Sequence, residues 1–359
     1  MTWVRTVTMA LLAVGTAATV AGQHRPKTPD QTRLDLIRRA QVWTPIDTAS
    51  LDLLEGPRDP HGFAPAATVT CDYVRRTLSG SSPKFACRLS PDDEVKVKYG
   101  GTNGEVYGEV VATRLLWALG FGADHMYSVR VVCRGCPEAV GDIGLPHGVR
   151  IADPAAIERK MPGRELVIDG IEGWAWRELD AVQPELGGAT RAQRDALKLL
   201  AAFMQHTDSK PGQQRLICLD EKHRAADPGR CDHPFMMLND VGLTFGRANV
   251  YNRQIPGSVD LAAWSRTPVW KDGTTCTAYL PETQTGTLAD PVISEDGRAF
   301  LARLMMQLSD AQLHDLFAAA RVQLRPRDPS SGRSGFPTIE EWVQAFKAKR
   351  ADIVNRRCA

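Results

Sequence analysis

Two aspartates, Asp208 and Asp240, could contribute to one site together with a nearby lysine and a nearby side-chain amide. Asp208 follows a long amphipathic segment, and Lys210 and Gln213 come within the next five residues. Asp240 comes just after an apolar run, and Gly242 follows two residues later. Hard cations such as Mg²⁺ prefer carboxylate oxygens, and a carboxylate beside a lysine can accept a proton next to developing negative charge. These residue types could therefore form a site that binds a divalent cation and accepts a proton.

The half of the chain before these aspartates is predicted to be mainly sheet. Alternating apolar residues, separated by turns rich in Gly, Ser, Pro and Asp, predict an antiparallel meander with strands at 68–74, 84–89 and 94–99. Apolar residues at helical spacing then predict a helix over 105–119, which Gly120 ends. A further strand is predicted at 127–133, and one or two more within 156–169 and 174–179.

The second half is predicted to be mainly helical. Its apolar residues recur at helical spacing over 191–205, 299–308, 310–320 and 339–353. These patterns divide the chain into a sheet-rich part at 66–180 and a larger helical part at 181–359. Lys98 and Glu109 lie in the first part and Asp208 and Asp240 in the second, so the two parts must meet if these residues share a site.

The motifs, taken in order, resemble the protein-kinase-like superfamily, in particular the atypical kinases of the HipA and phosphatidylinositol 3/4-kinase type. The resemblance covers roughly Thr68 to Gly246, and its motifs are Val97-Lys98, Glu109-Val110-Val111-Ala112, Asp208-x-Lys210-Pro211-x-Gln213 and Asp240-x-Gly242. It implies an α+β, bilobal fold with a small antiparallel-sheet N-lobe, one helix in that lobe, and a larger helical C-lobe. It also implies ATP and Mg²⁺ as cofactors and a hydroxyl acceptor on a protein or a small molecule.

In this resemblance the sheet-rich part binds the nucleotide. Lys98 corresponds to the strand lysine that contacts the nucleotide phosphates, and Glu109 to the helix glutamate that pairs with it. Lys96 lies on the same face of the strand and is an alternative to Lys98, and Glu105 is an alternative to Glu109.

The turn between the first two strands corresponds to the loop that covers the phosphates. It carries Gly80 and Ser81, whose backbone N–H groups are the predicted phosphate contacts. This turn has a single glycine where the kinase pattern has a G-x-G-x-x-G set.

The helical part supplies the catalytic and metal-binding residues of the resemblance. Asp208 corresponds to the residue that accepts the proton of the acceptor hydroxyl, and Lys210 to the lysine that contacts the transferred phosphate. Asp240 and Gln213 are the expected Mg²⁺ ligands. The chain departs from the kinase loop pattern at Thr207, which replaces an arginine, and at Gln213, which replaces an asparagine. His206 is expected to brace the loop.

Two other functions fit the same motifs. A catalytically degenerate pseudokinase would keep the fold as an extracytoplasmic binding or scaffold module. A nucleotidyltransferase would use the same residues but attack a different phosphate of the nucleotide.

The first 22 residues have the layout of a secretory signal peptide, with Arg5, a short apolar run and small residues at the end. The apolar run is shorter than the roughly 20 residues that span a bilayer, so no membrane span is expected after cleavage, and a secreted or periplasmic location is predicted. Residues 23–65 are rich in Pro, Asp and Arg and are expected to form a partly ordered arm outside the core. The formal charge of +2 gives no reason to expect a nucleic-acid partner.

Eight cysteines agree with an oxidising compartment. Their order predicts four local disulfides: Cys71 with Cys87, Cys133 with Cys136, Cys218 with Cys231, and Cys276 with Cys358. A zinc or redox pair at Cys133 and Cys136 is the alternative for the second of these. A zinc site that combines Cys218 and Cys231 with His223 and His233 is the alternative for the third.

Overall fold

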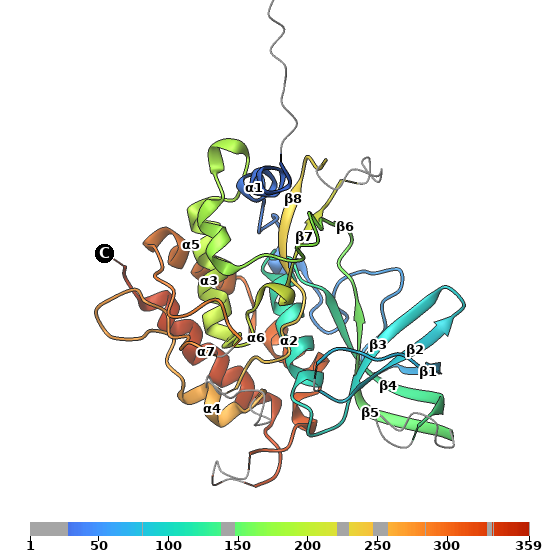
Figure 1. The fold of residues 1–359 in the computed structure, drawn as a ribbon. Helices are drawn as coiled ribbons and strands as arrows, with labels where there is room; N and C mark the ends of the chain where they lie inside the picture. The colour runs from blue at the N-terminus through green and yellow to red at the C-terminus, as the bar shows by residue number, and fades with distance from the viewer. Residues whose placement is uncertain are drawn as a thin grey trace, which may run out of the picture.

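The fold is that of a computed structural model, in which the signal peptide predicted at residues 1–22 lies outside the described part of the chain. The structure describes residues 28–80, 82–137, 148–220, 230–246, 258–283, 285–328, 332 and 334–358. The chain is a mixed α+β protein. Figure 1 shows its strand-rich part on the right and its helical part on the left.

Five strands of the strand-rich part close into a barrel in the order β1-β2-β3-β5-β4. They are β1 (Thr68–Val74), β2 (Lys84–Ser90), β3 (Asp93–Tyr99), β4 (His125–Cys136) and β5 (Gly148–Arg159). The antiparallel meander β1-β2-β3 is confirmed. The prediction of a small antiparallel sheet is confirmed only in part, because β1 also pairs in parallel with β4, from Thr68 opposite Arg130 to Asp72 opposite Arg134, and this pairing closes the sheet into a barrel.

The two faces of the barrel wall differ in chemistry because successive residues of a strand point to opposite sides. Val95 and Val97 of β3 pack inside the barrel with Val129, Val131 and Ile157. Lys96 and Lys98 alternate with those valines, so they face outward, toward the rest of the protein.

Helix α2 (Glu105–Ala118) connects the barrel to the helical part. Its residues are buried on every side except near its ends, which explains why its apolar face is not confined to one stripe. It contacts the barrel strands and also helix α6 (Asp310–Ala319). The expected end of this helix at Gly120 is confirmed, since Gly120 has a φ of +81°, a conformation that favours glycine.

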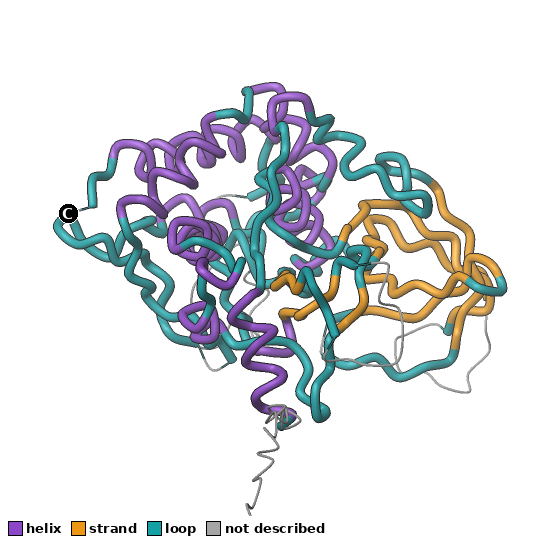
Figure 2. The backbone as a smooth tube through the Cα atoms, turned by 90° about the horizontal axis from the view of Figure 1, so that it is seen from above, coloured by secondary structure: helices purple, strands orange, loops and turns teal. Residues whose placement is uncertain are grey.

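The helical part is built around α3 (Arg191–Met204), which packs against α5 (Glu295–Met306). Helix α7 (Ile339–Asn355) contacts α5, α6 and the short α4 (Leu261–Arg266). In the view of Figure 2 these helices form a layer beside the barrel. Phe203, Trp264, Phe317, Trp342 and Phe346 form a continuous aromatic cluster in the centre of this part.

A second sheet lies between the two parts, with strand order β6-β7-β8. Its strands are β6 (Arg164–Glu165), β7 (Gln214–Cys218) and β8 (Pro234–Leu238). β7 and β8 are antiparallel, and Gln214 pairs with Leu238. Because the Asp208 loop leads into β7 and Asp240 follows β8, this pairing brings the two loops together.

The strands predicted within 156–169 and 174–179 are only partly present. β5 extends to Arg159 and β6 has two residues, whereas Trp176–Ala181 forms a 3₁₀ helix, η2. The prediction of a strand at 174–179 is therefore wrong. Trp174 and Trp176 are both buried, and the apolar alternation that suggested a strand reflects this burial.

The expectation that residues 23–65 pack outside the core is also wrong for the described part of that segment. Helix α1 (Pro29–Arg39) begins with a capping box formed by Thr28 and Gln31. Its residues Leu36 and Ile37 are buried in the main core, together with Val42.

All four predicted cysteine pairs form disulfides: Cys71–Cys87, Cys133–Cys136, Cys218–Cys231 and Cys276–Cys358. The alternative zinc sites at Cys133 and Cys136 and at Cys218 and Cys231 are therefore wrong, because a disulfide sulfur is not a thiolate ligand. His223 lies outside the described residues. Within the described part of the chain, every helix is too short or too polar to cross a membrane.

Candidate functional site

The site begins with Lys98 near the end of β3. Its side chain is 1% exposed and points from the outer face of the barrel toward α2. Its ammonium donates to Glu105 Oε2 at 2.6 Å and also to Glu109 Oε1. The two glutamates lie one helical turn apart on one face of α2, which is why both reach the same lysine. The alternatives Glu105 and Glu109 are thus both partners of Lys98.

Asp240 joins this group from the turn that follows β8. Its Oδ1 lies 3.6 Å from the Lys98 nitrogen and accepts a hydrogen bond of 3.3 Å from the Gly242 N–H. The carboxylates of Glu105, Glu109 and Asp240 lie within 4.8 Å of one another. We call Lys98 and these three carboxylates the lysine–carboxylate cluster. Asp240 keeps 28% of its side chain exposed, so the cluster opens to solvent at this residue.

Two glycines allow α2 to approach the Asp240 turn. A Cβ atom on Gly108 would lie 2.8 Å from the Gly242 carbonyl oxygen, and a Cβ on Gly242 would lie 2.7 Å from Glu105 Cγ. Larger residues at either position would push the helix away from the turn. The glycine of the Asp-x-Gly motif is therefore required by close packing, which holds Asp240 against Lys98.

The charges of the cluster shift one another's protonation. Burial alone would lower the pKa of Lys98, but Asp240, Glu109 and Glu105 outweigh it and hold this pKa well above its usual range. Burial raises the pKa of Glu109 well above its usual range despite Lys98. Burial opposes ionisation of Asp240 too, yet Lys98 lowers the pKa of that carboxyl. Asp240 is thus held in the anionic form.

The cluster has the donor set for a divalent cation. Three carboxyl groups face one buried ammonium, so the cluster holds more possible oxygen ligands than cations. Oε2 of Glu109 is buried without a hydrogen-bond partner among the described residues. Such an orphaned carboxylate oxygen is costly unless a proton or a cation satisfies it. These residues fit Mg²⁺, which prefers carboxylate oxygens.

The second half of the site is the loop after α3. The helix ends at Gln205, whose positive φ of 57° turns the chain into the loop. Both carboxylate oxygens of Asp208 accept from the Lys210 ammonium, at 2.9 and 2.7 Å, and one also accepts from the Gln213 side-chain amide at 2.8 Å. Burial tends to raise the pKa of Asp208, but hydrogen bonds from Lys210 and Gln213 outweigh it and lower this pKa.

Gln213 connects the two halves. Its side-chain amide donates to Asp208, and its backbone carbonyl accepts from the N–H groups of Asn239, at 2.8 Å, and Asp240, at 3.2 Å. The predicted site residues Asp208, Lys210, Gln213, Asp240, Lys98 and Glu109 therefore lie together in one region. The side chain of Gln213 contacts Asp208. The carboxylates beside Asp240 are those of Glu105 and Glu109 on α2.

A segment that the sequence did not single out supports the Asp208 loop. Thr283 donates to the Thr207 carbonyl at 2.5 Å, and Thr287 donates to the Ser209 carbonyl at 2.7 Å through its hydroxyl. The Ser209 hydroxyl accepts from the N–H groups of Thr287, at 3.1 Å, and Leu288, at 3.2 Å. We call Thr283 and residues 285–288 the threonine segment. Its run of threonines and a glycine was the available signal, but such runs also form ordinary turns.

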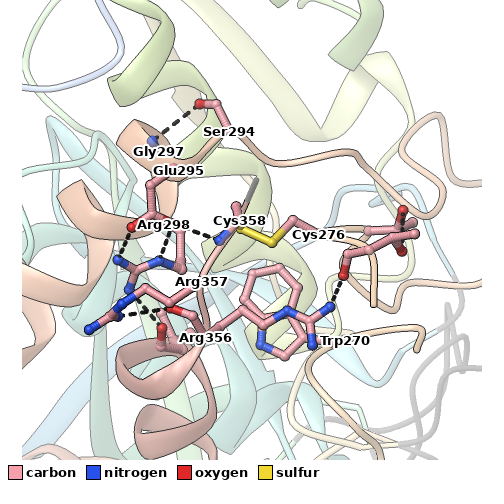
Figure 3. The surroundings of a disulfide bond; sticks show 12 residues. Trp270, Cys276, Ser294, Glu295, Gly297, Arg298, Arg356, Arg357 and Cys358 are labelled. Carbon is pink, nitrogen blue, oxygen red and sulfur yellow. Dashed lines mark hydrogen bonds and ion pairs between the residues drawn. A yellow bond between two sulfur atoms is a disulfide. The ribbon is translucent and has the colours of Figure 1, made fainter. Parts of the chain in front are cut away.

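This segment belongs to a stretch of chain that is anchored at its start by the Cys276–Cys358 disulfide. Figure 3 shows that the disulfide lies beside Glu295 and Arg298 of α5. The Cys358 N–H donates to Glu295 at 2.9 Å, and Arg298 also donates to this carboxylate. The end of the chain is thereby held next to the stretch that supports Asp208.

The predicted phosphate loop is only partly described. Gly80 has a φ of +86°, and Ser81 lies outside the described residues. A Cβ atom on Gly80 would lie 2.6 Å from the Lys84 nitrogen. Lys84 was not predicted as a site residue. It lies opposite Lys98 in the pairing of β2 with β3 and interacts electrostatically with Lys98, Glu105 and Asp240.

Lys96, the alternative to Lys98, has a different partner. It forms an ion pair with Glu158 of β5 and is outside the cluster, although it lies on the same face of β3. The structure therefore places Lys98, and not Lys96, beside Asp240.

His206 lies beneath the Asp208 loop. It is fully buried, neither ring nitrogen has a hydrogen-bond partner among the described residues, and its ring centroid is 6.2 Å from that of Trp176. Burial lowers its pKa to about 4. His206 therefore packs as a neutral side chain under the Asp208 loop, which is the loop that it was expected to brace.

Comparisons with known proteins find structural likeness but no sequence relative. No protein-family model and no curated protein matches the chain. Among solved structures, the chain is similar to CtkA, a Helicobacter pylori proinflammatory kinase, with 10% sequence identity and a TM-score of 0.42 over 81% of this chain and 96% of that chain. A likeness this distant does not assign the site, which depends on its own geometry.

Proposed function

We propose that this chain is a kinase-like phosphotransferase that uses Mg·ATP to phosphorylate a hydroxyl group on a protein or a small molecule. The observation that carries the proposal is the lysine–carboxylate cluster, in which Lys98 of the barrel meets Asp240 of the helical part at 3.6 Å. Asp208 joins it through Gln213. The barrel and the helical part then correspond to the two lobes of a kinase-like fold, and the cluster lies where they meet.

The cluster is suited to hold the nucleotide phosphates. The Lys98 ammonium stays charged at neutral pH because the carboxylates raise its pKa, and Glu109 fixes its position. A fixed positive charge in a buried site interacts strongly with phosphate oxygens. Asp240, with Glu105 or Glu109, would hold Mg²⁺, which supplies charge neutralisation at the phosphates. Gln213 remains the other proposed metal ligand.

The Asp208 loop is suited to the acceptor. Its carboxylate is anionic at neutral pH because its pKa is lowered, so it can accept the proton of a hydroxyl group. In the proposed reaction a bond forms between the acceptor oxygen and the γ-phosphorus, the bond to the ADP oxygen breaks, and the hydroxyl proton passes to Asp208. Lys210 contacts Asp208 directly and would stabilise charge on the transferred group.

We also propose that the reaction takes place outside the cytoplasm. The signal-peptide pattern at residues 1–22 and the four disulfides support this location.

The test is the Asp240→Ala variant of the mature protein, incubated with Mg²⁺ and ATP labelled at the γ-phosphate. We expect the variant to lose label transfer to protein or to added hydroxyl compounds by at least about 100-fold, because the cluster loses its solvent-facing anion. Asp180→Ala is the matched control, since Asp180 is exposed and pairs with Lys198 away from the site. Full label transfer by Asp240→Ala would refute the proposed site.

Two further measurements separate the alternatives. If label moves from the α-phosphate instead of the γ-phosphate, the chain is a nucleotidyltransferase. If Mg·ATP neither transfers label nor raises the melting temperature of the wild-type protein, the chain is a pseudokinase or scaffold.

A further inference from the structure

The barrel holds a cavity that borders the proposed active site, since Gly80 of the predicted phosphate loop and Lys84 are among its lining residues. It lies at the end of the barrel where β1 ends and β2 begins, and its volume is about 470 Å³. Small-molecule sites commonly have volumes of about 300 to 1,000 Å³. Phe85 and Tyr99 line it from the inner faces of β2 and β3, and both pack against the barrel interior. Lys98 points from the opposite face of β3, so this cavity and the cluster lie on the two sides of one wall.

Aromatic side chains form the walls of this cavity. Tyr73, Phe85 and Tyr99 line it, and the ring centroids of Phe85 and Tyr99 are 5.5 Å apart in a tilted arrangement. All three rings are only partly buried, so part of each remains accessible. Ile151, which is 57% exposed, adds an apolar surface at the mouth. A flat aromatic molecule would pack on such walls with favourable ring contacts.

The charged groups around the cavity are all positive. Arg76, Lys84 and Arg150 line it, and the lining within the described part of the chain contains no Asp or Glu. Arg76 is already paired with Glu94 at 2.9 Å. Arg150 lies close enough to Tyr99 for its charge to oppose the rise in pKa that burial causes in the Tyr99 hydroxyl. Lys84 interacts electrostatically with Glu105 and Asp240 of the cluster. Arg150 is therefore the cation placed beside the aromatic wall.

We propose that this cavity binds a small aromatic anion, whose ring packs on Phe85 and Tyr99 and whose acidic group pairs with Arg150. An aromatic surface without a cation would accept any apolar molecule, and a cation without the rings would accept any anion. The combination selects molecules that carry both groups. A charge-assisted contact to a guanidinium is among the stronger hydrogen bonds available to a ligand.

The test uses anilinonaphthalene sulfonate, a fluorescent aromatic anion, and phenylnaphthylamine, which has the same rings without the sulfonate. We expect the full mature protein, without nucleotide, to bind the sulfonate at one saturable site. Arg150→Gln should weaken sulfonate binding by about tenfold and leave the neutral probe unchanged, because only the charged contact is lost. Tyr99→Leu should weaken the binding of both probes.

Arg88→Gln is the control, since Arg88 is an exposed arginine of β2 that does not line the cavity. Circular dichroism and the melting temperature establish that each variant is folded. Wild-type sulfonate fluorescence that fails to saturate, equal affinity of wild type and Arg150→Gln, or an equal loss in Arg88→Gln would each overturn the proposal. Neither probe requires Mg·ATP turnover, so the result is independent of the proposed phosphotransferase activity.

Discussion

The two halves of the proposed site are held together by different interactions. The lysine–carboxylate cluster consists of buried charges that depend on one another, with Lys98 as the cation that holds Glu105, Glu109 and Asp240. The Asp208 loop is held largely by neutral hydrogen bonds from the threonine segment.

This difference predicts how each half responds to change. Removing one partner from a buried ionic group leaves the others unpaired in a low-dielectric environment, which is strongly destabilising. Removing one neutral hydrogen bond costs much less. The first half should therefore fail as a unit, and the second should weaken in small steps.

The largest effect is expected from Lys98→Met. The variant leaves three carboxylates without their cation, and we expect the free energy of unfolding at pH 7 to fall by about 3 to 5 kcal/mol. Urea denaturation measures this change. Combining Lys98→Met with Glu109→Leu should recover part of the loss, because the buried carboxyl group that loses its hydrogen-bond partner Lys98 is then also removed. Glu109→Leu could instead destabilise the Lys98→Met variant further, by as much as an ordinary core substitution destabilises a protein. The two halves of the site would then not differ in the way described.

A smaller effect is expected from lowering the pH, which tests whether His206 stays neutral beneath the Asp208 loop. His206 has a pKa of about 4 in the folded protein, below its value in the unfolded chain, so the unfolded state binds more protons between these values. Stability therefore falls as the pH drops, and the contribution of His206 between pH 7 and pH 5 is about 2 kcal/mol.

The His206→Gln variant isolates this contribution. The difference in unfolding free energy between pH 7 and pH 5 should be smaller in the variant than in the wild type by about 2 kcal/mol. His314→Gln is the control, because His314 is exposed on α6. An unchanged pH dependence in His206→Gln would mean that His206 can take up a proton in the folded state.

The smallest effect is expected from Thr283→Val. This change removes the hydrogen bond to the Thr207 carbonyl and the one that the hydroxyl accepts from the Gly286 N–H, and it keeps the shape of the side chain, so the unfolding free energy should fall by about 1 to 2 kcal/mol. Under the proposed function, phosphotransfer should decrease while the Mg·ATP-induced rise in melting temperature stays as in the wild type. Thr277→Val serves as control, since Thr277 lies on the same stretch but contacts Thr275 instead of the Asp208 loop. A loss of Mg·ATP binding in Thr283→Val would show that the two halves are not separable.

Local sequence patterns predicted the helices and strands that carry the site residues. The helices expected over 105–119 and 191–205 and the strands expected at 68–74, 84–89 and 94–99 agree with the structure to within one residue. The motif spacing also indicated that Lys98, Asp208 and Asp240 would lie together. These features depend on periodicity and on local turns, which the sequence records directly.

Features that depend on long-range pairing could not be predicted in the same way. The parallel contact between β1 and β4 closes the barrel, but no local pattern marks which strand lies beside β1. Burial of α1 depends on surfaces far away in the sequence.

The choice between Glu105 and Glu109 also lay beyond the sequence. Residues four apart lie on one face of a helix, so the pattern could not choose between them, and the structure uses both. The threonine segment was missed because its role depends on where the chain between α4 and α5 passes.

The Cys276–Cys358 disulfide makes a covalent ring of the last part of the chain, with a sequence separation of 82 residues. This ring contains the threonine segment and helices α5, α6 and α7. Unfolding of the C-terminal end of α7 would therefore also move the stretch that supports Asp208. Amide hydrogens of that stretch should consequently exchange with solvent only through larger opening events. An exopeptidase that starts from the C-terminus would reach α7 quickly only after the disulfide is reduced.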